Sequence, residues 1–332
     1  MIDRRVDVIA TTVSGSIQDW GKVKRITPLF REHGMDDVRL HVAESHRGAR
    51  EKACALLDEG GRILISAGGS GTFNSVLEGC CDSGLPLSDI LLGFLRKGSA
   101  DLIGKVLGMP DEIESAVRVF VDSIREERTV PCDVILASSA GAGDAPRHLV
   151  GYGGAEIFGR IPYFTENRFM KYYKGVLSQF FGDLGPFTTG MTLAVLEKLL
   201  KGAWSGKRTW RIKVDGALAS ENTYQALILV NGYLGPELPY SSAPLGSGSI
   251  YLFALRDLGV RRLVGQARSA RSGSIVKDPE EWGMESYTAE KSLVLESDSG
   301  DPFPVNVDGA TLSCREAVEF RIVDRIRLIS RD

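Results

Sequence analysis

The sequence has little of what membrane-spanning, secreted and metal-binding proteins usually show. No apolar run approaches the roughly 18 residues that a membrane-spanning helix needs, and the first residues lack the apolar core of a signal peptide. The five cysteines match neither a disulfide framework nor a zinc site, and the four histidines show no metal-ligand spacing. These absences predict a cytoplasmic protein whose contact with membranes, if any, is peripheral.

The chain also lacks an excess of positive charge. Its formal net charge is −3, so nothing in the composition indicates a nucleic-acid partner. Apolar residues make up 43% of the chain and charged residues 25%, which is typical of a globular protein. A length of 332 residues allows two domains with full cores.

The patterning changes near residue 130. Before it, short buried strands alternate with helical patterns, which predicts a doubly wound α/β domain with a parallel sheet. After it, alternating apolar runs are separated by turn signals such as Asp215-Gly216, which predicts antiparallel strands. A helical insertion is expected around residues 170–200 and a strand-rich tail at 318–329.

A glycine-rich turn follows the expected strand at residues 63–65. Gly68, Gly69 and Gly71 stand just before an expected helix, where backbone N–H groups and the helix dipole favour an anion such as phosphate. Thr72 adds a hydroxyl donor. The alternative is a tight turn that binds nothing, but three glycines in four residues favour phosphate binding.

Two common phosphate-binding motifs do not fit. The dinucleotide fingerprint needs a third glycine where this chain has Asn74. A Walker A reading of Gly98, Gly104 and Lys105 has a spacer one residue too long, and Val106 replaces the required serine or threonine.

The motifs instead resemble those of the diacylglycerol kinase catalytic family, which includes bacterial lipid kinases and sphingosine kinases. The family loop GGDGTxNEVxNG is matched by GGSGTFNSVLEG at residues 68–79, and PLGTGNDFAxxLGxP by RKGSADLIGKVLGMP at 96–110. The opening N-P-x-S-G corresponds to TTVSG at 11–15, and the late D-G-E to Asp308-Gly309-Ala310. These matches occur in the family's order along nearly the whole chain.

The resemblance implies a fold and an activity. It implies an α/β nucleotide domain at residues 1–130, an acceptor-binding β-sandwich at 131–317 and a C-terminal segment, 318–332, that returns to the first domain. It further implies transfer of the ATP γ-phosphate, with Mg²⁺, to the hydroxyl of a lipid or another small molecule in the cleft between the domains. The residues that it assigns to the nucleotide are Ser14, Gly15, Gly68, Gly69, Ser70, Gly71, Thr72, Gly98 and Ser99, with Asp308 as the catalytic base.

The departures from the family are mostly lost carboxylates. Five positions that are acidic in the family lack an acid here, namely Ser70, Ser75, Leu102, Ser247 and Ala310. Mg²⁺ prefers carboxylate oxygen and water, so we expect any Mg²⁺ to be held weakly, mainly by the nucleotide. Asp308 remains, but Asp-Gly is also a hairpin turn signal and V-D-G-A recurs at 214–217. Glu78 is the candidate for a displaced carboxylate.

Three functions therefore remain open. The first is an ATP-dependent lipid kinase of the diacylglycerol kinase type, which the glycine loops and Asp308 favour. The second is a non-catalytic nucleotide- or lipid-binding protein, which the lost acids favour. The third is a phosphotransferase similar to NAD kinase, since the GG-x-G loop is shared. The sequence also contains a cluster of arginines, which either forms a face for anionic lipid headgroups or is an ordinary solvated surface. The cluster comprises Arg256, Arg261, Arg262, Arg268 and Arg271.

Overall fold

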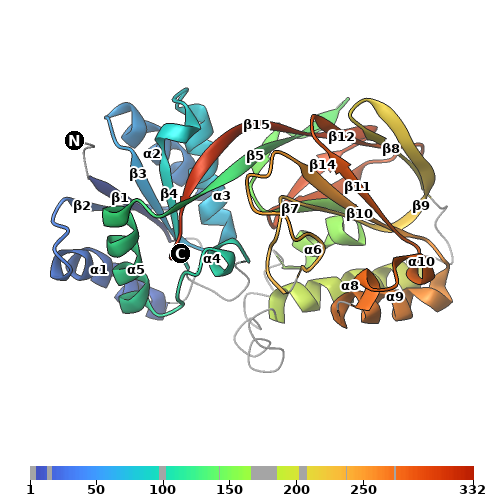
Figure 1. Ribbon diagram of the computed structural model, residues 1–332, viewed down its shortest axis with the longest axis horizontal. Helices are drawn as coiled ribbons and strands as arrows, with labels where there is room; N and C mark the ends of the chain where they lie inside the picture. Colours follow the sequence, from blue (N-terminus) through green and yellow to red (C-terminus); the bar gives the residue numbers. More distant parts are fainter. Residues whose placement is uncertain are drawn as a thin grey trace. The chain divides into compact units, whose positions relative to one another are not determined.

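The computed structural model describes residues 5–12, 17–96, 102–141, 143–165, 185–201, 208–236, 238–272 and 274–332. The chain forms two compact units, Met1–Val134 with Asp324–Asp332, and Ile135–Val323. Strands β5 (Thr129–Ala140) and β15 (Ala317–Ile329) run from one unit into the other (Figure 1). Every helix of the described ranges is too short or too polar to pass through a bilayer.

The first unit is built on a parallel sheet. Its strands are β1 (Val6–Thr11), β2 (Val38–Ala43), β3 (Ile63–Gly68) and β4 (Leu91–Arg96), in the order β2-β1-β3-β4. The end of β15 adds to β4 in parallel, at Arg327 and Leu328. Every residue of β1 and β3 is buried, as expected for central strands covered by helices on both faces.

Helices cover both faces of this sheet. They are α1 (Ile17–Glu32), α2 (His46–Asp58), α3 (Ser70–Asp82), the 3₁₀ turn η1 (Leu87–Asp89), α4 (Leu102–Val106) and α5 (Ile113–Glu126). Helix α1 packs with α5, and α2 packs with α3 on the opposite face (Figure 1). A Cβ at Gly79 would lie 2.3 Å from the carbonyl oxygen of Arg50, so glycine allows α2 and α3 to approach closely. The predicted doubly wound α/β arrangement is confirmed.

The second unit is rich in antiparallel strands, as predicted. Besides β5 and β15 its strands are β6 (Arg147–Leu149), β7 (Tyr152–Glu156), β8 (Thr209–Val214), β9 (Ala217–Val230), β10 (Ile250–Arg256), β11 (Met284–Ala289), β12 (Ser292–Ser297), β13 (Phe303–Val307) and β14 (Ala310–Cys314). They pair in the order β14-β13-β7-β9-β8-β12-β15, with β10 between β9 and β11. The core includes Trp210, whose ring meets that of Phe303 edge to face at 4.9 Å.

Helices of the second unit follow the prediction only in part. They are α6 (Ile157–Thr165), α8 (Gly185–Lys201), α9 (Val260–Ser272), the 3₁₀ turn η3 (Ser274–Val276) and α10 (Pro279–Trp282). Helix α8 falls in the expected insertion, whereas α6 ends before the insertion begins and was not predicted. Residues 166–184 lie outside the described ranges. Helix α9 was not predicted, and its buried positions include the polar residues Gln266 and Ser269.

Candidate functional site

The glycine-rich turn joins β3 to α3 at the carboxyl edge of the parallel sheet. Gly69 caps α3 with an extended backbone, and its carbonyl oxygen accepts hydrogen bonds from the N–H groups of Thr72 (3.0 Å) and Phe73 (3.1 Å). Helix geometry leaves the N–H groups of Ser70 and Gly71 without an intrahelical acceptor. These donors and the positive end of the helix dipole make the turn suitable for an anion.

The three glycines of this turn meet different requirements. A Cβ at Gly68 would lie 2.4 Å from Oγ1 of Thr72, and one at Gly71 would lie 2.8 Å from Cε1 of His46. Close packing therefore requires glycine at position 68, whereas a side chain at position 71 would displace the exposed ring of His46. At Gly69 a Cβ would meet no atom within 4 Å, so the start of α3 borders open space. A side chain at position 69 would extend into this open space.

The threonine hydroxyl of the turn faces inward. Oγ1 of Thr72 lies 2.7 Å from Oγ1 of Thr11 at the end of β1, and both residues are buried. This hydrogen bond ties the glycine turn to the neighbouring strand. The structure thus gives Thr72 a positioning task, and its predicted contact with phosphate stays a prediction.

Two residues at this edge were not among the predicted site residues. Thr11 supports Thr72, and the exposed His46 at the start of α2 places its ring against Gly71. The ends of parallel strands meet at one edge, so the residues after β1 and β2 could have been added to the site on topology alone. The other predicted nucleotide residues, Ser14, Gly15, Gly98 and Ser99, lie outside the described residues.

The positions that lost carboxylates offer few ligands for a metal. Oγ of Ser75 donates to the carbonyl oxygen of Gly71 (2.8 Å), and Leu102 is buried. Glu78 forms an ion pair with Arg50 (3.8 Å) and lies two helical turns beyond Ser70, about 12 Å along the axis. The described residues contain no group of three or more histidine, cysteine, aspartate or glutamate side chains that could hold a metal ion.

Asp308 lies in the second unit, in the two-residue turn between β13 and β14. It is 5% exposed, and its Oδ2 accepts hydrogen bonds from the N–H groups of Val150 (2.8 Å) and Gly151 (3.2 Å). Its Oδ1 accepts one from Tyr152 (2.7 Å). Burial raises the pKa of Asp308 to about 6, against the backbone hydrogen bonds that act to lower it. These contacts agree with the turn interpretation of Asp-Gly, and the role of Asp308 as base stays a prediction.

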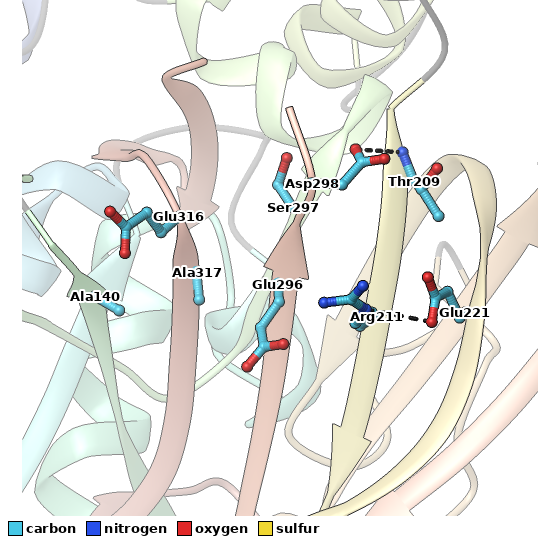
Figure 2. A pocket seen from close by; sticks show the side chains of 9 residues that line it. All are labelled: Ala140, Thr209, Arg211, Glu221, Glu296, Ser297, Asp298, Glu316 and Ala317. Atoms are coloured by element: carbon cyan, nitrogen blue, oxygen red, sulfur yellow. Dashed lines mark hydrogen bonds and ion pairs between the residues drawn. The ribbon is translucent and has the colours of Figure 1, made fainter. Parts of the chain in front are cut away.

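The second unit also has a surface pocket of about 350 Å³ (Figure 2). It is lined by Ala140, Thr209, Arg211, Glu221, Glu296, Ser297, Asp298, Glu316 and Ala317. Arg211 pairs with Glu221 (3.2 Å), and the N–H of Thr209 donates to Asp298 (2.9 Å) (Figure 2). Four carboxylates and one guanidinium make this pocket unsuitable for an acyl chain. The predicted acceptor pocket is therefore not this one and stays a prediction.

Comparison with known proteins finds the glycine turn within a segment that is similar to a known family domain. Residues 5–137 match the model of the diacylglycerol kinase catalytic domain. A curated diacylglycerol kinase from Staphylococcus saprophyticus is 29% identical over 86 residues, which are 26% of this chain and 27% of the relative. The match thus spans about a quarter of that relative's length.

Solved structures extend the likeness to both units. A diacylglycerol kinase from Bacillus anthracis str. Sterne is similar with a TM-score of 0.63 at 16% identity, over 98% of this chain and 96% of that one. A second structure from the same strain, provisionally named a diacylglycerol kinase, has a TM-score of 0.68 at 17% identity, over 98% and 97%. At such identities the likeness shows the fold. The resemblance to the diacylglycerol kinase catalytic family is confirmed.

Proposed function

We propose that this chain is an ATP-dependent lipid kinase of the diacylglycerol kinase type. The observation that carries the proposal is the Gly68–Thr72 turn, which leaves free helix N–H groups beside open space within the segment that matches the catalytic domain. The acceptor would be a lipid hydroxyl, and the ATP γ-phosphate the transferred group.

The chain's own residues would hold the nucleotide by its phosphates. The N–H groups of Ser70 and Gly71 would donate to phosphate oxygens, and the absence of a side chain at Gly69 would let the phosphates approach. The Thr11–Thr72 hydrogen bond and the packing of Gly71 against His46 would hold this turn in its binding conformation. Binding of this kind needs no carboxylate.

The donor set around the turn does not fit a Mg²⁺ ion held by the protein. Ser70 is exposed but carries only a hydroxyl, the Ser75 hydroxyl donates to the backbone, and Glu78 is paired with Arg50. Mg²⁺ favours carboxylate oxygens and water. Any Mg²⁺ in this site would therefore be carried by the phosphates of the nucleotide.

The lost acids favour a second candidate, a nucleotide-binding protein that does not catalyse transfer. Without a bound cation to neutralise the transferring phosphoryl group, the transition state loses its main counter-charge. Asp308 adds to this case, because both of its oxygens already accept backbone hydrogen bonds. Nucleotide binding is common to both candidates, and turnover separates them.

The first test measures nucleotide binding by titration calorimetry with ATP and ADP, each with and without Mg²⁺. Gly69→Val should abolish binding and keep the thermal unfolding midpoint within a few degrees, because a valine can adopt the extended backbone at this position and its side chain enters open space. Gly71→Val is less informative, since it would also displace His46. Ser75→Ala is the matched control, and it should bind like wild type. Failure of the wild type to bind either nucleotide at millimolar concentration would refute the site.

The second test measures Mg²⁺-dependent ATP turnover on vesicles containing diacylglycerol or other lipid alcohols. Lipid-dependent turnover by wild type supports the kinase. Binding without turnover, with turnover gained in the pair Ser70→Asp and Ala310→Glu, supports the non-catalytic candidate. Replacing both positions matters because one carboxylate alone restores only one ligand.

A further inference from the structure

Helix α9, Val260–Ser272, is strongly basic. Its sequence VRRLVGQARSARS contains four arginines and no acidic residue. Arg261, Val264, Arg268 and position 271 recur at intervals of three, four and three residues, which places them on one face of a helix. This arginine–valine stripe accounts for most of the positive charge of the helix.

The packing of α9 fixes which face meets solvent. Leu263, Gln266 and Ser269 are buried, and Gln266 Nε2 donates to the carbonyl oxygens of Arg256 (3.0 Å) and Trp282 (2.8 Å). The face of α9 that carries these three residues therefore packs against the rest of the unit. The stripe is on the other side, where Arg261 and Arg268 are exposed and Val264 is 58% exposed.

Within the described residues, neither Arg261 nor Arg268 forms an ion pair. The nearby acids Asp278, Glu280 and Glu281 belong to α10 and its cap. Helix α10 lies along the flank of α9, where a guanidinium nitrogen of Arg262 donates to the carbonyl oxygen of Glu281 (3.2 Å).

Exposed aliphatic side chains accompany the arginines. Leu258 precedes α9 by two residues and Val276 follows it in η3, and each is 39% exposed. Val264 lies within the stripe, and Leu258 and Val276 flank the helix in the sequence. Arginines that attract anionic headgroups, together with aliphatic groups that enter the headgroup region, are the two features of helices that lie on membrane surfaces.

We propose that the exposed face of α9 docks this protein on an anionic lipid bilayer. The proposal deepens the proposed function, because a lipid acceptor would be met at a membrane. Its test is independent of that function, since vesicle binding needs no nucleotide.

The experiment is co-sedimentation of the full chain with vesicles of phosphatidylcholine alone or of an equimolar mixture with phosphatidylglycerol. We expect binding to the anionic vesicles only, weakened by added salt because screening shortens the reach of the charges. The double variant Arg261→Gln/Arg268→Gln should bind more weakly by about fivefold per arginine. Val264→Ser should show a smaller loss.

A matched control is available in the same unit. Arg147 and Arg315 are exposed and form no ion pair within the described residues, so Arg147→Gln/Arg315→Gln changes the net charge equally. The control should keep wild-type binding.

Equal losses of vesicle binding in both double variants, equal binding to neutral vesicles, or no binding to anionic vesicles would overturn the proposal. Burial of the stripe in a dimer, seen by light scattering, or tighter binding to a nucleic-acid duplex than to vesicles would also overturn it. Nucleotide titration of each variant without vesicles shows whether the proposed kinase site fails separately.

Discussion

Two hairpins of the second unit share the sequence V-D-G-A and the same turn. Residues 214–217 connect β8 to β9, and residues 307–310 connect β13 to β14. The valine pairs with the alanine in both hairpins. Asp215 and Asp308 have φ of 50° and 47°, and the glycines that follow both have φ of 87°. Positive φ at both central residues is typical of a type I′ turn.

The two turns also dock in the same way on another part of the unit. The carboxylate of Asp215 accepts hydrogen bonds from three consecutive N–H groups, those of residues 290–292, and its own N–H donates to the carbonyl oxygen of Ser292 (2.8 Å). Asp308 repeats this with residues 150–152 and the carbonyl oxygen of Tyr152 (2.9 Å). The sequence V-D-G-A thus forms the same turn with the same set of hydrogen bonds to a neighbouring segment at both places.

The surroundings of the two aspartates are opposite. Asp215 is exposed, and although partial desolvation acts to raise its pKa, the backbone hydrogen bonds outweigh it and lower that pKa. Asp308 is buried, and burial raises its pKa. The comparison shows that an aspartate in a kinase-like D-G motif can be explained by turn chemistry. It also shows that burial, not the motif, decides the direction in which the pKa of the aspartate shifts.

The largest effect on stability is expected from Asp308→Ala. It removes the carboxylate that accepts hydrogen bonds from three buried N–H groups, and each lost bond costs about 1–3 kcal/mol, so the free energy of unfolding should fall by about 3 kcal/mol or more. Chemical denaturation at neutral pH measures this. If activity disappears while stability is unchanged, Asp308 is catalytic and not structural.

The next effect concerns pH. Between about pH 4 and 6 folded Asp308 keeps a proton that the unfolded chain has released, so its contribution makes stability fall as pH rises and then level off. A shift of about 2 pKa units corresponds to up to about 3 kcal/mol. Asp308→Asn should remove this dependence in denaturation curves across the window. The contribution of Asp215 to stability has the opposite pH dependence, because its lowered pKa makes stability fall as the pH drops below about 4.

Glycine replacement should affect both hairpins alike. Gly216→Ala and Gly309→Ala place a Cβ on a left-handed backbone, which costs about 1 kcal/mol at each site. Thermal unfolding of the two variants should give similar shifts. A much larger decrease in the unfolding temperature for Gly309→Ala would mean that packing around the buried turn, as well as its dihedral angles, requires glycine there.

The smallest effect is expected from Asp215→Ala. Water can replace the lost acceptor at this exposed turn, so the free energy of unfolding should fall by at most about 1 kcal/mol. Chemical denaturation of the Asp215→Ala and Asp308→Ala variants side by side gives the two losses in the free energy of unfolding. Equal losses at the two aspartates would contradict the assigned difference in burial.

Much of the first unit could be predicted from the sequence. Buried strands alternating with helices indicated the parallel sheet, and the placement of Gly68, Gly69 and Gly71 indicated the turn between β3 and α3. The sequence could not show that the Thr72 hydroxyl bonds to Thr11, 61 residues away, or that Glu78 pairs with Arg50. Helix α9 was missed because its buried positions include Gln266 and Ser269, which a search for apolar periodicity ignores.

Local sequence by itself determined the turn types, the glycine loop and the spacing of arginines on α9, because dihedral preferences and helical periodicity act over a few residues. Only the tertiary structure decided which of two identical aspartates is buried. The N–H groups that meet Asp308 are contributed by residues 156 to 158 positions away in the chain. Desolvation depends on such distant neighbours, so the pKa of an aspartate cannot be obtained from the four residues of its turn.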